Sequence, residues 1–427
     1  MKKIFFQIVL LALVLGISST FSNEVTLSVG PQYANQVWYN ITNNEQTTQP
    51  LASWDIAFYS YDQNASIRIN SGAGAKLWEV LGKTLIDFGT DIDTTGLTSN
   101  PERFVEWFNS DTTWAVGAFN RGRNGFENDG DFGWGAYNMS THAIVGDKLF
   151  IYKSIEGKYY IIIIEDLIGG TYTFTYRLLD NPETATREFS KKSTSTKLFG
   201  YYSISADNYL DFEPLQDSWE LLFTKYTAMI YDENGNLVPY GVMGALSNRG
   251  IKVAKVEDVP TNQSTTPVLD SFLTNISTIG HTWKIYDFNS GWSLVPDLSY
   301  FVIANNGEIY KIVFTSFGGS STGEITFDNN WVETGVNESF ETGNSFVLTP
   351  NIIEKHNAFD ILLNANSSTY TAKLNIYSIT GENILSRDLS LANGLNAFSI
   401  ENNLSSGIYI VALNLNGKTQ VQKLIVK

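Results

Sequence analysis

Cysteine is absent from the 427 residues of this chain. Its absence excludes disulfide bonds, thiolate metal sites, a cysteine nucleophile and a lipid anchor attached through cysteine. Histidine is scarce, with three residues, and methionine occurs four times. Basic residues are also few, with 28 Lys and Arg against 44 Asp and Glu and a formal net charge of −16. Nucleic acid is therefore not an expected partner, because phosphate binding requires clustered positive charge.

Long apolar runs are missing apart from one near the N-terminus. Met1-Lys2-Lys3 precedes an apolar segment at residues 4–17, and small residues follow up to Ser22. A basic start, a short apolar core and a small-residue exit are typical of a secretory signal peptide. The run is shorter than the roughly 20 apolar residues of a membrane-spanning helix. We therefore expect residues 1–22 to be a signal peptide and the mature protein to have no transmembrane segment.

Catalytic signatures are missing as well. The sequence has no Gly-x-Ser-x-Gly, no His-Glu-x-x-His and no phosphate-binding glycine loop. Paired carboxylates such as Asp91 and Asp93 cannot be told from ordinary loop polarity without geometry. The sequence therefore predicts a protein that is not an enzyme.

Aromatic and β-branched residues are abundant, and two segments share one pattern of strands and turns. Residues 145–176 are predicted to form three strands, with turns at Glu156-Gly157 and Gly169-Gly170. Residues 300–327 repeat this design, with an Asn-Gly turn at Gly307. The matching turn glycines, Gly157 and Gly307, are 150 residues apart (307 − 157). One antiparallel three-stranded element is thus expected twice.

Two further landmarks recur in the same order. Ser-Trp-Asp-Ile-Ala-Phe at residues 53–58 returns as Ser-Trp-Glu-Leu-Leu-Phe at residues 218–223, a spacing of 165 (219 − 54). Gly133-Trp134 returns as Gly291-Trp292. Landmarks in one order at similar spacings indicate a duplicated unit of domain size.

We therefore expect an all-β protein with two tandem antiparallel β domains. The first covers residues 23–181 and the second residues 182–335, where Val238–Gly250 replaces the segment Ile67–Gly74. Between residues 90 and 130, Asp, Asn, Thr and Gly predominate, which predicts loops with one short helix near residues 101–108.

The C-terminal part, residues 344–427, has short alternating strands with turn signals about every ten residues, which predict a small β-sandwich. It resembles the type A C-terminal sorting domain of type IX secretion substrates. That family's pattern is met by Leu348-Thr349-Pro350-Asn351, Ile376-Tyr377 with Gly381, Leu404 with Gly407 and Tyr409, and residues 422–427. Ile352 departs from it, since the family usually repeats proline there. The resemblance implies that residues 344–427 engage the type IX secretion machinery, and that the protein crosses the outer membrane to be released or attached to the cell surface.

The two predicted repeats resemble the HmuY-like family of secreted haem-binding proteins. The residues that carry this resemblance are Trp54–Phe58, Ile67–Asn70, Gly133-Trp134, and Tyr300–Phe327 with Gly307. The resemblance implies an all-β fold and haem as cofactor, with the iron held between two histidine or methionine side chains on loops. The lipoprotein anchor common in that family is missing, and the C-terminal domain would take its place.

Met139 and His142 are the haem-ligand candidates that this resemblance indicates, because an axial ligand of the family occupies this loop. Imidazole nitrogen and thioether sulfur are both suitable axial donors. The second family ligand lies upstream, in the region of residues 85–120, where this chain has neither His nor Met. His281 would serve only if the two repeats faced each other, and His356 is expected at the surface of the sorting domain. An ordinary loop histidine and a packed methionine remain the alternative interpretation.

A second hypothesis is a surface adhesin that binds a glycan or a partner and has no haem activity. Several tryptophans lie in polar segments, and aromatic faces stack on sugar rings: Trp107, Trp114, Trp134 and Trp292. Aromatic-rich β cores would explain the same composition.

Overall fold

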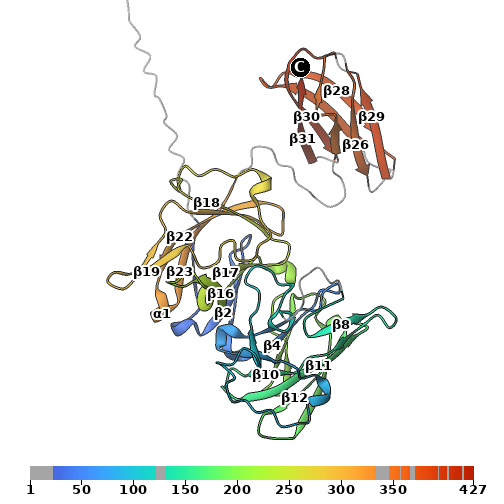
Figure 1. The fold of residues 1–427 in the computed structure, drawn as a ribbon. Coiled ribbons are helices and arrows are strands. Elements are labelled where there is room, and N and C mark those ends of the chain that lie inside the picture. Colours follow the sequence, from blue (N-terminus) through green and yellow to red (C-terminus); the bar gives the residue numbers. More distant parts are fainter. Residues whose placement is uncertain are drawn as a thin grey trace, which may run out of the picture.

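The structure is a computed structural model, and it describes residues 23–121, 130–332, 346–355, 357–365, 371–392, 394–401, 403–415 and 418–427. The expected signal peptide and His356 lie outside these residues. The described chain is built from β-sheets that are antiparallel except for the β25–β31 pair of the C-terminal domain, with one short α-helix, α1 (Gly319–Thr322), among the described residues. The predicted all-β fold class is therefore confirmed, and Figure 1 shows the sheets in sequence colours.

Two large sheets contain more than half of the strand residues between residues 23 and 332. One has the order β1-β23-β22-β21-β18, formed by β1 (Glu24–Ser28), β18 (Lys252–Val256), β21 (Ser299–Ile303), β22 (Ile309–Phe317) and β23 (Glu324–Trp331). The other has the order β13-β12-β11-β10-β6-β7, with β8 and β9 added beside β11. Its strands are β6 (Lys76–Val80), β7 (Phe104–Trp107), β8 (Gly135–Asn138), β9 (Ala143–Gly146), β10 (Phe150–Lys153), β11 (Tyr159–Ile168), β12 (Thr171–Leu178) and β13 (Thr184–Ser190).

Two four-stranded sheets and one hairpin complete this part. The order β15-β14-β4-β5 joins β4 (Ile56–Tyr59), β5 (Ile67–Ile69), β14 (Phe199–Ser203) and β15 (Asn208–Leu210). The order β17-β16-β2-β3 joins β2 (Asn35–Asn40), β3 (Glu45–Pro50), β16 (Leu221–Tyr231) and β17 (Leu237–Ser247). The hairpin consists of β19 (Lys284–Asp287) and β20 (Gly291–Leu294). Short 3₁₀ turns connect the strands: η1 (Pro31–Tyr33), η2 (Leu51–Ser53), η3 (Ser71–Ala73), η4 (Leu85–Asp87), η5 (Ala118–Asn120), η6 (Lys191–Thr194), η7 (Gln216–Ser218) and η8 (Leu269–Ser271).

The C-terminal domain has two sheets of its own. The orders are β24-β26-β29 and β25-β31-β30-β27-β28. Their strands are β24 (Phe346–Thr349), β25 (Ile352–Ile353), β26 (Phe359–Ala365), β27 (Thr371–Ser378), β28 (Asn383–Ser390), β29 (Gly394–Ile400), β30 (Gly407–Leu415) and β31 (Lys418–Val426). Apolar side chains of both sheets, such as Phe359, Leu374 and Leu424, pack into a single buried cluster. This is the small β-sandwich that the sequence predicts.

Residues 90–130 contain a strand where a helix was expected. Residues 104–107 form β7, which pairs with β6 from Leu77–Trp107 to Val80–Phe104. The short-helix prediction was wrong, because Phe104 is buried in a small apolar cluster with Trp78 and Leu149 when the segment is extended.

Apart from β7, the described strands of the two halves of residues 23–332 follow the same order. The β11–β12 pairing shifts register between Ile164 and Asp166, and the β22–β23 pairing does so between Phe314 and Ser316. The two irregularities are 150 residues apart (314 − 164), which is also the spacing between Gly157 and Gly307. The duplication stays a prediction, and this shared irregularity supports it, since a β-bulge at the same place in two sheets is a specific feature.

One proposed landmark was paired wrongly. Trp134 is fully buried just before β8, and its Nε1 donates a hydrogen bond to the Ala65 carbonyl. Its counterpart is Trp283, which is 1% exposed just before β19 and donates to the Gly280 carbonyl. Trp292, which the sequence pattern matched to Trp134, lies on β20 and is 41% exposed. The pair Gly291-Trp292 matches Gly133-Trp134 in sequence, but Trp283 is the residue that matches Trp134 in the structure.

The first three strands of each half belong to the sheets of the other half. β1 pairs with β23 and β2 pairs with β16, so strands from the start of the first half complete the second. Reciprocally, β13 pairs with β12 and β14 pairs with β4. Strand pairing therefore defines a first unit at residues 51–215 and a second unit at residues 23–50 plus 216–332. The expected boundary between residues 181 and 182 separates two stretches of sequence but does not separate two folding units.

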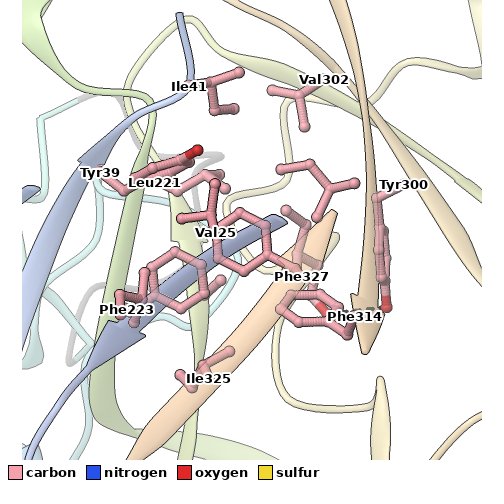
Figure 2. Packing of buried hydrophobic residues seen from close by; sticks show 14 of the residues in the cluster. Val25, Tyr39, Ile41, Leu221, Phe223, Tyr300, Val302, Phe314, Ile325 and Phe327 are labelled. Carbon is pink, nitrogen blue, oxygen red and sulfur yellow. Dashed lines mark hydrogen bonds between the residues drawn. The ribbon is translucent and has the colours of Figure 1, made fainter. Parts of the chain in front are cut away.

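Each unit buries its own apolar core. In the second unit, Val25, Tyr39 and Ile41 of the exchanged segment pack against Phe223, Tyr300, Phe314 and Phe327, as Figure 2 shows. The equivalent cluster of the first unit contains Phe58, Tyr152, Tyr172 and Tyr202. Since burial of each such side chain contributes roughly 1.5–3 kcal/mol, the exchanged segments contribute several kcal/mol to each core.

The two units also pack against each other. Met229 N donates to the Asp111 carboxylate at 3.1 Å, Ile276 N to the Thr112 carbonyl at 3.2 Å, and Trp114 Nε1 to the Ser247 carbonyl at 2.9 Å. An apolar cluster with residues of both units, including Trp38, Tyr201 and Trp219, lies between them. The loop at residues 110–114 is therefore a structural connection between the units.

Candidate functional site

His142 closes the turn of the β8–β9 hairpin in a left-handed backbone conformation, with φ 55°. Its N–H donates to the Asn138 carbonyl at 2.9 Å, and the Asn138 side-chain oxygen accepts from Ser140 N at 2.9 Å and Thr141 N at 3.2 Å. Left-handed backbone is uncommon for residues other than glycine and clusters at functional positions. Gly291 takes such a conformation, with φ 80°, at the end of the β19–β20 turn. The first hairpin thus carries an imidazole where the second hairpin has glycine.

The imidazole of His142 is oriented by Tyr137. His142 Nδ1 lies 2.8 Å from Tyr137 Oη, and the two rings are 6.3 Å apart between centroids. A hydrogen bond at one ring nitrogen sets the tautomer and the direction of the other. Tyr137 therefore engages Nδ1, and Nε2 is the ring nitrogen that this hydrogen bond does not use.

We call the space beside this hairpin the His142 cleft. It has a volume of about 310 Å³ and lies between the hairpin, the turn at Gly169 and Gly170, and the loop at residues 62–64. Its walls combine polar and apolar side chains: Asp62, Gln63, Asn64, Phe132, Tyr137, His142, Ile144, Leu167 and Lys191. The volume is at the lower end of small-molecule sites, which span roughly 300–1,000 Å³.

Lys191 brings a buried cation to this cleft. Its side chain is 2% exposed, and Nζ donates to the carbonyls of Tyr61, Asp62 and Asn64. Burial lowers the pKa of Lys191 to about 8. At neutral pH the group therefore keeps most of its positive charge beside the cleft.

Met139 does not line the His142 cleft. It sits at the tip of the hairpin and is 82% exposed. The structure therefore separates the two residues that the sequence analysis considered together.

A second cleft lies at the corresponding place in the other unit, and we call it the Trp292 cleft. It has a volume of about 510 Å³ and is bounded by the β19–β20 hairpin, β17 and η1. Its described lining residues are Tyr33, Ile230, Tyr240, Gly241, Val242, Met243, His281, Lys284, Tyr286, Trp292 and Ser320. Tyr286 is the third residue of β19, as Tyr137 is the third residue of β8. The described lining of each cleft thus contains one histidine. His142 lies in the turn of its hairpin, whereas His281 lies before the first strand of the other hairpin.

His281 is partly buried in the Trp292 cleft. Its Nδ1 lies 3.4 Å from Tyr226 Oη, and burial followed by the charge of Lys284 lowers its pKa. Met243, which also lines the cleft, is 4% exposed and belongs to the apolar core of the second unit. The two repeats do not bring His142 and His281 into one cleft.

The four tryptophans proposed for glycan stacking have different environments. Trp114 and Trp134 are buried, and Trp107 donates through Nε1 to the Glu79 carboxylate at 3.0 Å. Trp292 alone among these four lines one of the two clefts. Sequence reasoning missed Tyr137, Lys191, Tyr240, Lys284 and Tyr286. The recurrence of a tyrosine two residues before each turn begins, at 137 and 286, is the one signal that would have found part of this set.

The His142 cleft fits one axial position of haem. His142 provides an oriented imidazole, and the described residues lining the cleft provide no second histidine, methionine or cysteine. The upstream region 85–120, where a second ligand was expected, does not line this cleft. The residues present would thus suit a haem held through a single protein ligand.

Comparison with known families agrees with the sequence resemblance. Residues 355–427 match the family described as Secretion system C-terminal sorting domain. The chain is accordingly a secreted β protein, exported across the outer membrane to the cell surface or the surroundings. Residues 32–176 match the family described as HmuY protein. This segment is therefore similar to the HmuY family, and it follows the first half of the sequence rather than one of the two units.

Other comparisons add little. No curated protein matches the chain. Among solved structures, a polysaccharide lyase is 10% identical, with 83% of this chain and 39% of that chain covered and a TM-score of 0.16. Dimeric latent PorU from Porphyromonas gingivalis is 11% identical, with 95% and 34% covered and a TM-score of 0.17. The chain thus spans well under half the length of either protein, and such TM-scores carry no argument. Within the described part of the chain, no helix is long and apolar enough to cross a membrane.

Proposed function

We propose that this exported protein captures a flat, largely apolar ligand, and haem in particular, in the His142 cleft. The observation that carries the proposal is an imidazole fixed by Tyr137 at a cleft inside the segment that matches the HmuY family. The protein binds and carries its ligand, and no catalytic step is part of the proposal.

The geometry of His142 supports a role in ligand binding. A histidine that binds a metal usually donates its second ring N–H to a neighbouring oxygen, which increases the basicity of the binding nitrogen. Tyr137 Oη occupies the position of that oxygen, 2.8 Å from Nδ1. His142 takes a left-handed backbone conformation, in which histidine, asparagine and aspartate are enriched among residues other than glycine, so the turn accepts an imidazole at this position.

The chemistry of the cleft walls suits the same ligand. Phe132, Ile144 and Leu167 offer apolar contact to a macrocycle, and Lys191 offers positive charge toward acidic substituents. Haem, when bound, would supply an iron that accepts the Nε2 lone pair of His142. The tip residue Met139 takes no part in this arrangement.

A haem titration of the chain beginning at residue 23 tests the proposal. We expect a saturable shift of the Soret band at one haem per protein, and loss of that shift in His142→Ala. Met139→Ala should bind like the unmodified protein, because its side chain lies outside the cleft lining. His281→Ala serves as the histidine control, since His281 belongs to the other cleft. Binding that is insensitive to His142→Ala, or no saturable binding, would contradict the proposal.

A further inference from the structure

Trp292, which lines the Trp292 cleft, meets two neighbouring aromatic rings at steep angles, and of these two rings Tyr286 also lines the cleft. Trp292 and Tyr286 have centroids 5.1 Å apart at 60°, and Trp292 and Phe317 have centroids 5.1 Å apart at 82°. Faces set at such angles do not form a parallel slot for a flat macrocycle. They suit a puckered ring, whose C–H groups can contact an aromatic face while its edges point elsewhere.

A buried lysine also lines this cleft. Lys284 is 6% exposed and lines the cleft, and its Nζ donates to the carbonyls of Met243 at 2.6 Å and His281 at 3.4 Å. The ammonium group lies 4.1 Å from the ring centroid of Trp283 and 4.8 Å from that of Phe317. Its hydrogen-bond acceptors among the described residues are neutral carbonyls, and burial lowers the pKa of Lys284 to about 7. An anionic ligand in the cleft would favour the charged form of this lysine.

Hydroxyl-bearing residues also line the Trp292 cleft, beside Trp292, Tyr286 and Lys284. The hydroxyls of Tyr33, Tyr240 and Tyr286 and of Ser320 belong to lining residues, and each can donate and accept hydrogen bonds. A volume of about 510 Å³ lies within the usual range for small ligands. The ligand that these features describe has a puckered ring, several hydroxyls and a carboxylate.

We propose that the Trp292 cleft binds an acidic sugar, a hexuronic acid residue, with the ring on Trp292 and Tyr286 and the carboxylate toward Lys284 and His281. This site is separate from the His142 cleft and does not depend on haem binding. It gives the glycan hypothesis a defined place on the molecule.

Calorimetric titration of the chain beginning at residue 23 with methyl glucuronide and with methyl glucoside tests this proposal. We expect saturable binding of the glucuronide and at least tenfold weaker binding of the neutral glucoside. Trp292→Ala should weaken glucuronide binding at least tenfold. Trp331→Ala is the matched control, because Trp331 is also about half exposed, at 49%, in the same unit but does not line the cleft.

Lys284→Met separates charge from packing, since it keeps an apolar side chain of similar length. We expect this variant to lose the preference for glucuronide over glucoside, with near-ultraviolet circular dichroism confirming a native core. Trp292→Ala changes an exposed residue and keeps the test informative if Lys284→Met does not fold. A glucuronate-containing tetrasaccharide that binds more tightly than the monosaccharide would assign the cleft to a glycan chain, and equal affinity would assign it to the free sugar. No saturable glucuronide binding, equal affinity for the neutral sugar, or an unaffected Trp292→Ala variant would overturn the proposal.

Discussion

Asp55 and Glu220 occupy the same position in the two halves and hold the same two backbone segments. The Asp55 carboxylate accepts from Ile204 N at 2.8 Å and Ile155 N at 3.4 Å. The Glu220 carboxylate accepts from Ile41 N at 2.8 Å and Asn305 N at 3.1 Å. In both cases one bonded N–H belongs to the exchanged segment and the other to a turn of the receiving sheet. Each carboxylate thus joins the exchanged strands to the unit that receives them.

Asp55→Asn and Glu220→Gln should each destabilise the protein by about 3 kcal/mol. Both carboxylates are almost fully buried, and hydrogen bonds to a charged acceptor contribute roughly 1.5–3 kcal/mol each, with a further cost for buried donors left unpaired. Urea denaturation of both variants measures the change in the free energy of unfolding. Glu233→Gln, in an exposed turn, is the control and should remain within 0.5 kcal/mol. Changes as small as the control's would show that these carboxylates do not secure the exchange.

The reciprocal exchange predicts that the two halves require each other. Residues 23–181 and 182–332 expressed as separate chains should assemble into a one-to-one complex when mixed. Without the partner, each receiving sheet lacks strands whose buried residues, such as Val25, Tyr39 and Ile41 in the second unit, contribute several kcal/mol together. This loss is comparable to the total stability of a typical domain.

Size-exclusion chromatography with light scattering measures the assembly. Each chain alone should self-associate or be unfolded by circular dichroism. Two folded monomers that do not associate would contradict the exchange.

Glu213 predicts a specific dependence of stability on pH. Its carboxyl is buried and accepts from Tyr201 Oη at 2.5 Å and Leu198 N at 2.6 Å. Burial raises the pKa of Glu213 from 4.5 to about 7. The folded state then binds the proton more tightly than the unfolded state, so this contribution to stability is present below about pH 4.5 and is lost as the pH rises to about 7.

Glu213→Gln should remove this dependence. Between pH 5 and pH 8 we expect the free energy of unfolding of the variant to rise relative to the unmodified protein by on the order of 2 kcal/mol. Denaturation at the two pH values measures the difference, and Glu233→Gln should show none. A constant difference across this range would show that the Glu213 carboxyl does not titrate differently in the folded protein.

The left-handed backbone of His142 predicts which replacements the hairpin accepts. His142→Gly should be more stable than His142→Ala by about 1 kcal/mol, because alanine is strained at φ 55° and glycine is not. Gly291→Ala in the second hairpin should lose a similar amount for the same reason, with φ 80°. Thermal denaturation measures all three variants. Equal stability of the glycine and alanine variants would show that the turn relaxes to another conformation.

Much of the fold could be predicted from local patterns. The strands around Gly157 and Gly307, the C-terminal sandwich and the all-β class follow from alternation of apolar residues and from turn glycines, which act over a few residues. The prediction of a helix near residues 101–108 was wrong. Burial of Phe104 in an extended strand outweighed the weak local preference for a helix. Trp283 was missed as the partner of Trp134 because burial, not the neighbouring glycine, defines their equivalence.

The sequence by itself determined the class of protein, the export route carried by residues 355–427, and His142 as a candidate ligand in the segment related to HmuY. Those conclusions rest on composition, short motifs and alternation within single strands. Tertiary structure alone decided that the halves exchange their first three strands, that Met139 does not line the His142 cleft, and that Lys284, Tyr286 and Trp292 share a cleft. Strand partners far apart in the chain are chosen by the total burial and hydrogen bonding of whole sheets, and no local stretch of sequence contains that sum.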